Sequence, residues 1–390
     1  MSGTRGSVLC LSHLRWNGVF QRPQHLLVRC ARDHEVVFFE EPIFGAERAA
    51  LQTSRDESGV IVATPQVPGG LAPRELDAAL CAMIDQIVAG PLSAARPVLW
   101  YYTPMALPFT HQVRAQAVVY DCMDELSLVQ GAPPDVVARE RLLFDHADVV
   151  FAGGHSLCEH KRATSAHRNI HAFPSSVDAA HFARARGAIA EPADQIAIPP
   201  RRVGYFGIID ARLDLALLAE LADARPDLQL VMIGPIVKID PASLPRRANL
   251  HWLGAKRHAE LPAYIAHWDV AMMPFARNDS TRFISPTKTP EYLAAGRPVV
   301  ATPITDVVTP YGRDGLAWIA DSAPAFAAAI DEALACDRGA LRARADAFLA
   351  DRSWDDTWRA MWALVERASA LAATSASCGF VRTDTHRAAG

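Results

Sequence analysis

Two series of short apolar segments, each alternating with longer segments of helical period, run through this chain. The short segments are rich in Val, Ile and aromatic residues, as in EVVFFE at 35–40 and PVLWYY at 97–102. This alternation is typical of parallel sheets that are covered by crossover helices. Between the two series lies a Pro- and Ala-rich stretch without clear period, which ends in the double proline at 199–200. The sequence therefore predicts an α/β fold with two sheets and a cleft between them.

The predicted strands fall into the same two series. In the first half we expect strands at 7–12, 35–40, 59–63, 97–102, 116–120 and 147–152, with helices between them such as 134–146 and 155–165. The second series predicts strands at 202–206, 228–233, 249–253, 269–273, 297–301 and 316–319. Open α/β sheets bind ligands beyond the carboxyl ends of their strands, so we expect the site in the loops that follow these strands.

The length of 390 residues exceeds what a single hydrophobic core usually supports, which favours two domains. Ser353 is placed to cap a long final helix, and the Ala-, Ser- and Thr-rich segment after that helix predicts a flexible tail. The predicted division is an N-terminal domain at 1–175, a linker at 176–200, a C-terminal domain at 201–352, a final helix at 353–372 and a tail at 373–390.

Composition excludes several classes of protein. A formal net charge of -4 gives no general basic field of the kind that nucleic-acid binding needs, so we expect no nucleic-acid partner. The seven cysteines are scattered and never form a C-x-x-C pair, which indicates reduced thiols in a cytosol. The N-terminus is too quickly polar for a signal peptide, and no run of 18 apolar residues occurs. We expect a cytoplasmic protein, with peripheral association at the inner face of the membrane left open.

The segment ISPTKTPEYLAAGRPVVATP at 284–303 carries the strongest signal for a ligand. Ser285 is placed to cap a helix whose first position is Pro286, although the later Pro290 argues for a distorted helix or a later start. Lys288 then lies in the first turn, where a cation meets the positive end of the helix dipole at a cost of roughly 0.3 to 1 kcal/mol. A bound anion would reverse this penalty, so Lys288 and the amides around Thr287 predict a diphosphate site.

Glu291 follows Lys288 by three residues on the same helix face. Its carboxylate is suited to accept hydrogen bonds from ribose hydroxyls, as acidic residues do in other nucleotide sites. The alternative interpretation is an exposed ion pair between Lys288 and Glu291, which would carry no function.

A second candidate segment is VGYFGIIDARLD at 203–214, where a strand runs into Gly207. Gly207 allows the backbone to come close to a ligand, and Arg212 could hold phosphate oxygens with two hydrogen bonds. The alternative is a turn glycine and an arginine that only pairs with Asp210 or Asp214.

Two loops of the first half should face the cleft. The loop HLRWNGVFQRPQHL at 13–26 offers Gly18 together with Arg22 and His25, which are candidates to touch the sugar or the acceptor. The loop YDCMDEL at 120–126 places Asp121, Asp124 and Glu125 directly after a strand, a common position for functional carboxylates. The alternative for Arg22 and His25 is that they only cap and solvate their loop, and the alternative for the carboxylates is that at least one only caps the following helix.

Several other chemistries lack their sequence motifs. There is no G-x-G-x-x-G, no G-x-x-x-x-G-K-[ST], no H-E-x-x-H and no complete G-x-S-x-G, although GGHSLCEH at 153–160 contains part of the last. No D-x-D triplet is present, and only His167 and His171 have the helical spacing of a metal pair. We therefore predict no metal site.

The candidate segments described above, by contrast, resemble motifs of GT-B fold glycosyltransferases, close to the family 4 retaining enzymes that build bacterial cell-surface polysaccharides. The resemblance covers nearly the whole chain. It rests on SPTKTPEYLAAGRPVV at 285–300, GYFGIIDARLD at 204–214 and NLHWLGAKRHAELPAYIAHWDVAMMPF at 249–275, with support from WNGVFQRPQHL at 16–26 and PSSVDAAHF at 174–182. The fold that it implies has two Rossmann-like domains facing a cleft.

The resemblance also implies roles for individual residues. Glu291 would bind the donor ribose, Lys288 and Arg212 would neutralise the diphosphate, and Asp121 would lie beside the transferred sugar. The loop after Gly254 would flank the base, and the final helix would return to brace the N-terminal domain. The donor-binding residues are then Gly207, Arg212, Ser285, Pro286, Thr287, Lys288 and Glu291, with Asp121, Arg212, Lys288 and Glu291 as the catalytic group.

The sequence departs from the family pattern at two positions. Phe283 stands where the first glutamate of a paired motif is usual, and Ile208 stands where a basic residue often follows the glycine. Arg282, or Arg22 from across the cleft, is a candidate to substitute.

The activity implied is transfer of a sugar from a nucleotide-diphosphate sugar to a glycan or lipid-linked acceptor hydroxyl. Retention of configuration, no essential metal and no tightly bound cofactor are part of this implication. Two alternatives stay open: a nucleotide-sugar epimerase or hydrolase of the same fold, and a non-catalytic nucleotide-sugar-binding partner.

Overall fold

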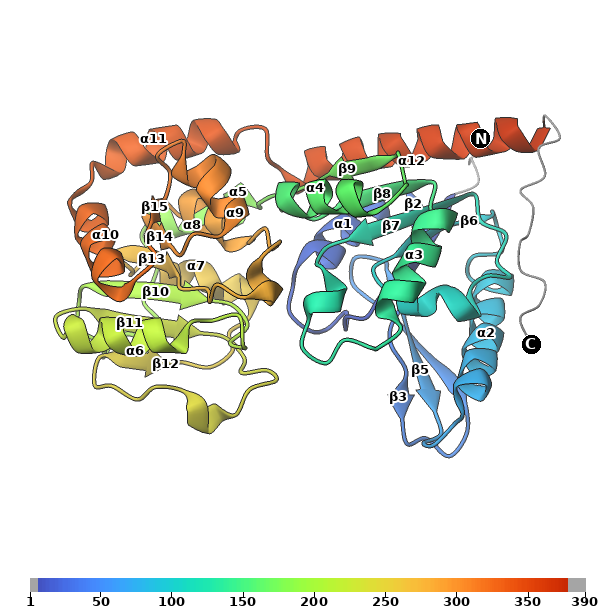
Figure 1. The fold of residues 1–390 in the computed structure, drawn as a ribbon, viewed down its shortest axis with the longest axis horizontal. Coiled ribbons are helices and arrows are strands. Elements are labelled where there is room, and N and C mark those ends of the chain that lie inside the picture. Colours follow the sequence, from blue (N-terminus) through green and yellow to red (C-terminus); the bar gives the residue numbers. More distant parts are fainter. Residues whose placement is uncertain (1–5, 378–390) are drawn as a thin grey trace.

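A computed structural model of the protein describes residues 6–377, which form two parallel-sheet domains (Figure 1). The N-terminal sheet has the order β3-β5-β2-β1-β6-β7-β8-β9, with β4 added antiparallel to β5. Its strands are β1 Gly6–Leu11, β2 His34–Phe39, β3 Ile43–Phe44, β4 Ala50–Arg55, β5 Ile61–Val67, β6 Pro97–Tyr101, β7 Ala117–Cys122, β8 Val149–Ala152 and β9 Ile170–Ala172. Its main helices are α1 Arg22–Cys30, α2 Pro73–Ala89, α3 Val136–His146 and α4 His155–Thr164.

The C-terminal sheet is parallel throughout, in the order β12-β11-β10-β13-β14-β15. Its strands are β10 Arg202–Phe206, β11 Gln229–Ile233, β12 Leu250–Trp252, β13 Val270–Met273, β14 Val299–Ala301 and β15 Trp318–Ile319. The helices of this half are α5 Ala179–Ala183, α6 Leu215–Ala224, α7 Leu261–Ile265, α8 Lys288–Ala294, α9 Thr305–Val307, α10 Ala323–Ala335 and α11 Arg338–Leu349. Both sheets reverse their strand order beside the first strand, which is where open α/β sheets hold ligands.

The central strands of the N-terminal sheet are buried on both faces, and their side chains alternate between two cores. Leu9 and Leu11 of β1 belong to the core on the α2 and α3 side. Val8 and Cys10 belong to the opposite core, together with residues of α1 and α12. Burial on both faces explains why these strands read as continuous apolar runs rather than as alternating ones.

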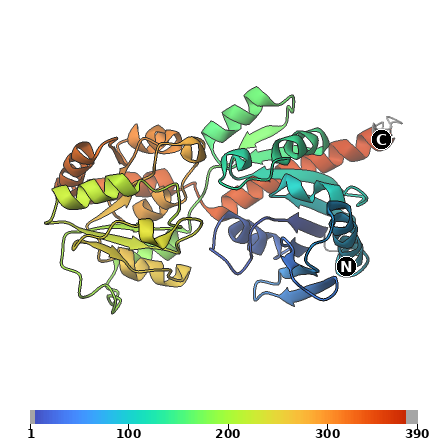
Figure 2. The ribbon, with the colours of Figure 1, turned by 60° about the horizontal axis from the view of Figure 1, so that its bottom comes forward.

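The last helix, α12 (Trp354–Ser377), crosses from the C-terminal half onto the N-terminal domain (Figures 1 and 2). Trp354, Trp358 and Met361 bury their side chains in the core that covers β1, β6 and β7. Ser353 caps the helix as expected, since its Oγ accepts a hydrogen bond from the Asp356 N–H at 3.0 Å.

The helix extends five residues beyond the predicted end at 372, and the rest of the predicted tail, 378–390, lies outside the described residues.

Most predicted strands agree with the structure to within one or two residues, whereas β3, β4 and β9 were missed. These three are short or lie at an edge, and β4 is mostly exposed, so they lack the buried apolar signal. One difference of boundary matters for the site, because β7 continues to Cys122 instead of ending at 120. Among the described residues, no helix is long and apolar enough to span a bilayer.

Candidate functional site

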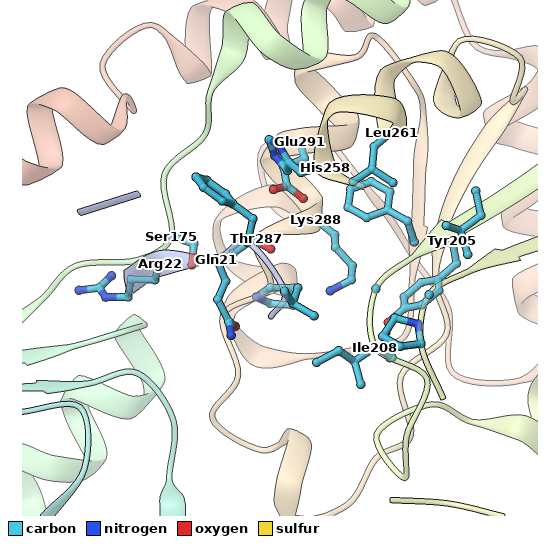
Figure 3. A pocket seen from close by; sticks show the side chains of 18 of the residues that line it. Gln21, Arg22, Ser175, Tyr205, Ile208, His258, Leu261, Thr287, Lys288 and Glu291 are labelled. Atoms are coloured by element: carbon cyan, nitrogen blue, oxygen red, sulfur yellow. Dashed lines mark hydrogen bonds between the residues drawn. The ribbon is translucent and has the colours of Figure 1, made fainter. Parts of the chain in front are cut away.

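A cavity of about 760 Å³ lies between the two domains, at the carboxyl ends of the strands of both sheets (Figure 3). The N-terminal domain contributes the loop after β1 together with Met123, Asp124 and Gly153, which follow β7 and β8. The C-terminal domain contributes the larger share: Tyr205, Phe206, Gly207, Ile208, Arg212, Gly234, Pro235, Ala255, Lys256, Arg257, His258, Phe275, Ser285, Pro286, Thr287, Lys288 and Glu291. All seven residues that the sequence singled out for donor binding therefore meet in one place.

Two glycines form a tight backbone contact on the floor of this cavity. Gly207 follows β10 with φ +144°, and Gly234 follows β11 with φ +152°, conformations that only glycine adopts readily. A Cβ atom at position 234 would lie 1.8 Å from the carbonyl oxygen of Gly207. The space above Gly207 is taken by Lys288, whose Cε would lie 2.1 Å from a Cβ at position 207. The predicted close approach at Gly207 is thus made to another backbone and to the catalytic candidate Lys288.

The ammonium of Lys288 lies between two aromatic rings. Its Nζ is 5.6 Å from the ring centre of Tyr205 and 5.9 Å from that of Phe275. No carboxylate lies within ion-pair distance of Lys288 in residues 6–377. Burial lowers the pKa of Lys288 to about 8, an effect that nearby Glu291 opposes. The half-buried lysine therefore presents its charge to the cavity without an internal partner, as an anion-binding group would.

Glu291 is 8% exposed, and its Oε2 has no hydrogen-bond partner. Burial raises the pKa of Glu291, and the nearby charge of Lys288 opposes this rise. An unpartnered buried carboxyl oxygen is costly, and a ligand hydroxyl that donates to it would relieve that cost. The alternative of an exposed Lys288–Glu291 ion pair is wrong, because both residues line the cavity and no ion pair joins them (Figure 3).

The helix that carries both residues starts later than predicted. α8 begins at Lys288 with Thr287 before it, so Ser285 is not its cap and Pro286 is not its first residue. Pro290 explains the difference, since it is the third residue of α8, where a backbone N–H needs no intrahelical acceptor. Ser285, Pro286 and Thr287 still line the cavity as the loop that leads into α8.

Arg212 lines the cavity, but its guanidinium is held by a neighbour. Its Nε and Nη2 donate to the carboxylate of Asp210 at 3.0 and 2.7 Å. Asp214, the other partner that the sequence allowed, instead caps α6 by accepting from the Leu217 N–H at 2.9 Å. The pair fixes the orientation of Arg212 and leaves its remaining N–H groups for a ligand.

Asp121 does not reach the cavity, which corrects its predicted place beside the transferred sugar. It is fully buried and forms an ion pair with Arg22, which is 4% exposed. Arg22 Nε donates to Asp121 Oδ1 at 3.0 Å, and Nη1 donates to the carbonyl of Phe173 at 2.7 Å. The physical reason is that β7 continues through Asp121, so this side chain points into the sheet face that α1 and α12 cover.

Arg22 lies at the edge of the cavity, yet its charge is used inside the N-terminal domain, and Figure 3 shows its side chain pointing away from Lys288. Arg22 lines the cavity with Gly18 and Asp124, but its guanidinium is already paired with Asp121. Contact of Arg22 with sugar or acceptor stays a prediction.

His25 also differs from its prediction. Its ring stacks on that of Trp354 at 4.5 Å and 8°, and burial lowers its pKa to about 3. It lies behind Phe20, whose ring is 4.6 Å away and does line the cavity. A neutral, buried histidine in this position packs the C-terminal helix against α1 and does not contact a ligand.

Sequence reasoning missed the aromatic pair around Lys288, the role of Gly234 and the individual residue His258. Gly234 was detectable, because it follows a predicted strand directly, as Gly207 does. His258 belongs to the loop after Gly254 that was expected to flank the base, and its ring lies 5.1 Å from Phe20 of the other domain. Tyr205 and Phe275 gave no signal, since they belong to strand-like apolar runs.

The two residues that depart from the family pattern, Phe283 and Ile208, both lie at or near the interface between the domains. Phe283 stacks on His160 of the N-terminal domain at 4.4 Å, and Ile208 lines the cavity. Within residues 6–377, no group of three or more His, Cys, Asp or Glu side chains is arranged to hold a metal ion.

The known proteins that this chain resembles in sequence are glycosyl transferases. Residues 202–336 match the family described as "Glycosyl transferases group 1". TuaH of Bacillus subtilis (strain 168), named as a teichuronic acid biosynthesis glycosyltransferase, is 25% identical over 240 residues, which are 57% of this chain. The aligned part spans 59% of the length of that relative.

Solved structures share the architecture along nearly the whole chain. A trehalose-6-phosphate protein from E. coli bound with UDP-2-fluoro glucose superposes with a TM-score of 0.68 at 12% identity, covering 93% of this chain and 99% of the other. Sucrose-phosphate synthase from Thermosynechococcus elongatus gives 0.65 at 15% identity, covering 96% and 100%. Anabaena HepE in complex with UDP and glucose gives 0.62 at 13% identity, covering 95% and 99%. These superpositions establish a shared fold, and at identities this low they establish nothing beyond the fold.

Proposed function

We propose that this chain, which has the GT-B fold and the group 1 glycosyl transferase pattern at 202–336, transfers a sugar from a nucleotide-diphosphate sugar to an acceptor hydroxyl. The observation that carries the proposal is the pairing of an unpartnered ammonium with an unpartnered carboxyl oxygen in one interdomain cavity. Lys288 and Glu291 supply these two groups, at a spacing of three residues on α8. A diphosphate and a ribose present the complementary groups in one molecule.

In this proposal residues 201–352 form the donor domain. Lys288 meets the diphosphate directly, and Arg212 adds a second cation whose orientation Asp210 fixes. These charges are in place before the reaction, so they stabilise the negative charge that grows on the leaving diphosphate without reorganising. The carboxyl of Glu291 accepts from the ribose. The loop Ala255–His258 flanks the base, as its position on the cavity wall supports.

We propose a uridine diphosphate sugar as the donor. Two proteins of the same fold hold UDP-2-fluoro glucose or UDP with glucose, and they match this chain over more than nine-tenths of its length. Transfer with retention of configuration and without an essential metal completes the proposed reaction. NMR of the anomeric proton in the product tests the stereochemical part.

Residues 1–175 form the acceptor domain in this proposal. Gly18 and Asp124 offer the contacts nearest the donor. A second cavity of about 330 Å³ lies at the carboxyl ends of β1, β2 and β6, with mostly apolar walls that include Phe39, Leu80 and Phe109. This cavity favours an acceptor with an apolar portion, such as a lipid-linked glycan made at the inner face of the membrane. TuaH, a relative named for teichuronic acid biosynthesis, supports a cell-surface product.

The decisive experiment is calorimetry of the full chain with UDP, GDP, ADP and dTDP, followed by the matching nucleotide sugars. Wild type is compared with Lys288→Met and Glu291→Gln, and with Glu332→Gln, which changes an exposed carboxylate on α10. We expect one nucleotide class to bind wild type and the control equally and both site variants more weakly. Absence of binding by every nucleotide would overturn the proposed function.

The same preparation separates the alternative activities. Donor consumption that requires an acceptor supports transfer, and donor consumption without an acceptor indicates an epimerase or hydrolase. Binding without consumption on any acceptor indicates a non-catalytic partner. If Arg212→Ala and Lys288→Ala left turnover unchanged, the assignment of both residues would be wrong.

A further inference from the structure

The segment Gly153–Ser156, which the proposed reaction does not use, starts α4 and lies against the C-terminal domain. The His155 N–H donates to Asp306 Oδ2 at 2.9 Å, and the Ser156 N–H donates to Asp306 Oδ1 at 3.0 Å. Asp306 lies on α9 of the C-terminal domain and is 4% exposed. One carboxylate therefore binds the first two amides of a helix that belongs to the other domain. Figure 1 shows α4 at the side of the N-terminal domain that faces the C-terminal domain.

This contact suits both partners. The first amides of a helix have no intrahelical acceptor, and a carboxylate there also meets the positive end of the helix dipole. Because Asp306 is buried, salt screens the interaction much less than it would at the surface. Asp306 thus supplies the cap that α4 lacks from its own chain segment, since Gly154 at the N-cap position has no side chain to provide it.

Gly154 is required by the closeness of the two domains. Its φ of −162° is extended backbone that any residue adopts. A Cβ atom at position 154 would nevertheless lie 2.2 Å from Asp306 Oδ2 and 2.8 Å from the Cβ of Ser285. A side chain at position 154 would therefore push α4 away from Asp306 and from the loop that leads into α8.

About one turn after Ser156, α4 contacts residues of both domains. His160 stacks on Phe283 at 4.4 Å and 21°, so α4 contacts the start of the loop 283–288, here called the donor loop. Lys161 Nζ forms ion pairs at 2.7 Å with both Glu125 and Glu140. Glu125 is adjacent to Asp124, which lines the cavity. Through these contacts α4 connects the donor loop with the loop that follows β7 in the N-terminal domain.

We propose that Asp306 and the N-terminus of α4 form an interdomain latch that holds the donor loop against the N-terminal domain. Asp306 is then a positioning residue: it touches no substrate, and it acts through α4, Gly154 and Ser285. Its effect on the donor rests on the proposed function. The latch itself is a property of the nucleotide-free chain and is tested separately.

The first test uses the full chain without nucleotide. Asp306→Ala removes both hydrogen bonds, and Gly154→Ala keeps the carboxylate but adds the clashing Cβ. Asp314→Asn is the matched control, because Asp314 is an exposed aspartate in the same β14–β15 connection. We expect both latch variants to increase the radius of gyration in small-angle scattering and to speed hydrogen exchange in α4 and the donor loop, with the control unchanged.

Local capping of α4 makes a different prediction. Faster exchange confined to the first turn of α4, with an unchanged radius of gyration in both variants, would overturn the latch. Far-UV circular dichroism and thermal unfolding of each variant establish that the domains stay folded. Gly154→Ala keeps the test decisive if Asp306→Ala fails to fold, because it changes no charge.

The second test measures UDP affinity by calorimetry. A ligand that binds the closed arrangement has an apparent Kd that rises as the closed fraction falls, so we expect about tenfold weaker binding in both latch variants. A rise in the donor KM that exceeds the fall in kcat would distinguish this effect from lost chemistry. Equal UDP affinity in wild type, Asp306→Ala and Gly154→Ala would contradict the positioning role. If UDP binds none of the proteins, the proposal of a uridine donor fails, and the proposed function fails if GDP, ADP and dTDP do not bind either; scattering and exchange still decide the latch.

Discussion

The side chain of Lys288 crosses directly over Gly207, so closely that a Cβ atom at position 207 would lie 2.1 Å from the lysine Cε. Gly207 directly follows the strand β10 of the C-terminal domain, and Lys288 begins α8, more than eighty residues later in the chain. The glycine therefore serves two purposes. It adopts φ +144°, and it leaves the space through which the ammonium reaches the cavity.

Substitution of Gly207 by alanine should disturb both the backbone conformation and the position of Lys288. We expect Gly207→Ala to weaken UDP binding by about tenfold or more, because Lys288 must move, and to lower the free energy of unfolding by roughly 1 to 3 kcal/mol. Calorimetry and urea unfolding measure the two effects. Gly315→Ala is the control, since Gly315 has φ +67° with open space around it. Comparable loss of UDP affinity in the control would show that strain alone is responsible.

The pH dependence of donor binding should follow Lys288. Burial lowers its pKa to about 8 in the free protein, and a bound diphosphate would raise it again by favouring the charged form. Binding is therefore fully present below about pH 8 and weakens as the pH rises through that value, because proton uptake must then accompany binding. Calorimetry from pH 6.5 to 9.5 in buffers of different ionisation enthalpy measures this uptake.

In the Lys288→Met variant we expect UDP affinity to be lower by roughly 10- to 100-fold, the loss of a hydrogen bond to a charged group. Its affinity should also be independent of pH above 7. A variant that kept the slope between pH 7.5 and 9 would assign the titration to another group.

Glu291→Gln should weaken nucleotide binding and raise the stability of the protein at alkaline pH. The buried carboxyl oxygen of Glu291 has no partner, and burial raises its folded-state pKa. Its contribution to stability is therefore present below the unfolded pKa and is lost as the pH rises through the higher folded value. We expect the glutamine variant to lack this loss and to unfold at a higher temperature than wild type at pH 8 to 9, while it binds UDP more weakly. Equal Tm shifts at pH 5 and pH 9 would contradict the account.

The Arg22–Asp121 pair should be structural. Breaking a buried ion pair on one side leaves an uncompensated charge, so Asp121→Asn should lower the free energy of unfolding by about 3 to 5 kcal/mol. UDP affinity of the folded variant should stay within about twofold of wild type, an affinity difference of less than about 0.5 kcal/mol. Asp145→Asn, at an exposed position on α3, is the control for stability. A stable Asp121→Asn protein that had lost donor binding would restore Asp121 to the site.

The sequence by itself determined the architecture and brought out most of the C-terminal residues that line the interdomain cavity. Strands buried on both faces read as apolar runs whatever their partners are, so β10 and β13 were predictable locally. Gly207, Lys288 and Glu291 belong to short segments whose turn and helix signals are local as well. Because the carboxyl ends of parallel strands meet at one edge, these separate segments could be expected to converge.

Tertiary structure decided which polar side chains face the cleft. Asp121 and Asp124 are three residues apart in one loop motif, yet pairing of β7 with β8 through Asp121 and Phe151 extends the strand and turns Asp121 into the core. A strand alternates its side chains between two faces, so one further residue pair changes what a carboxylate does. The partner that buries Asp121 is Arg22, which lies 99 residues away in the sequence.

The same reasoning applies to His25 and Asp306. His25 is neutral and buried because Trp354 of the returning helix stacks on it, and Asp306 acquires a role only where α4 of the other domain meets it. Local sequence specifies strands, turns and caps through interactions between near neighbours. The protonation, burial and partner of a side chain depend on what long-range packing brings beside it, and for this protein only the assembled domains supply that.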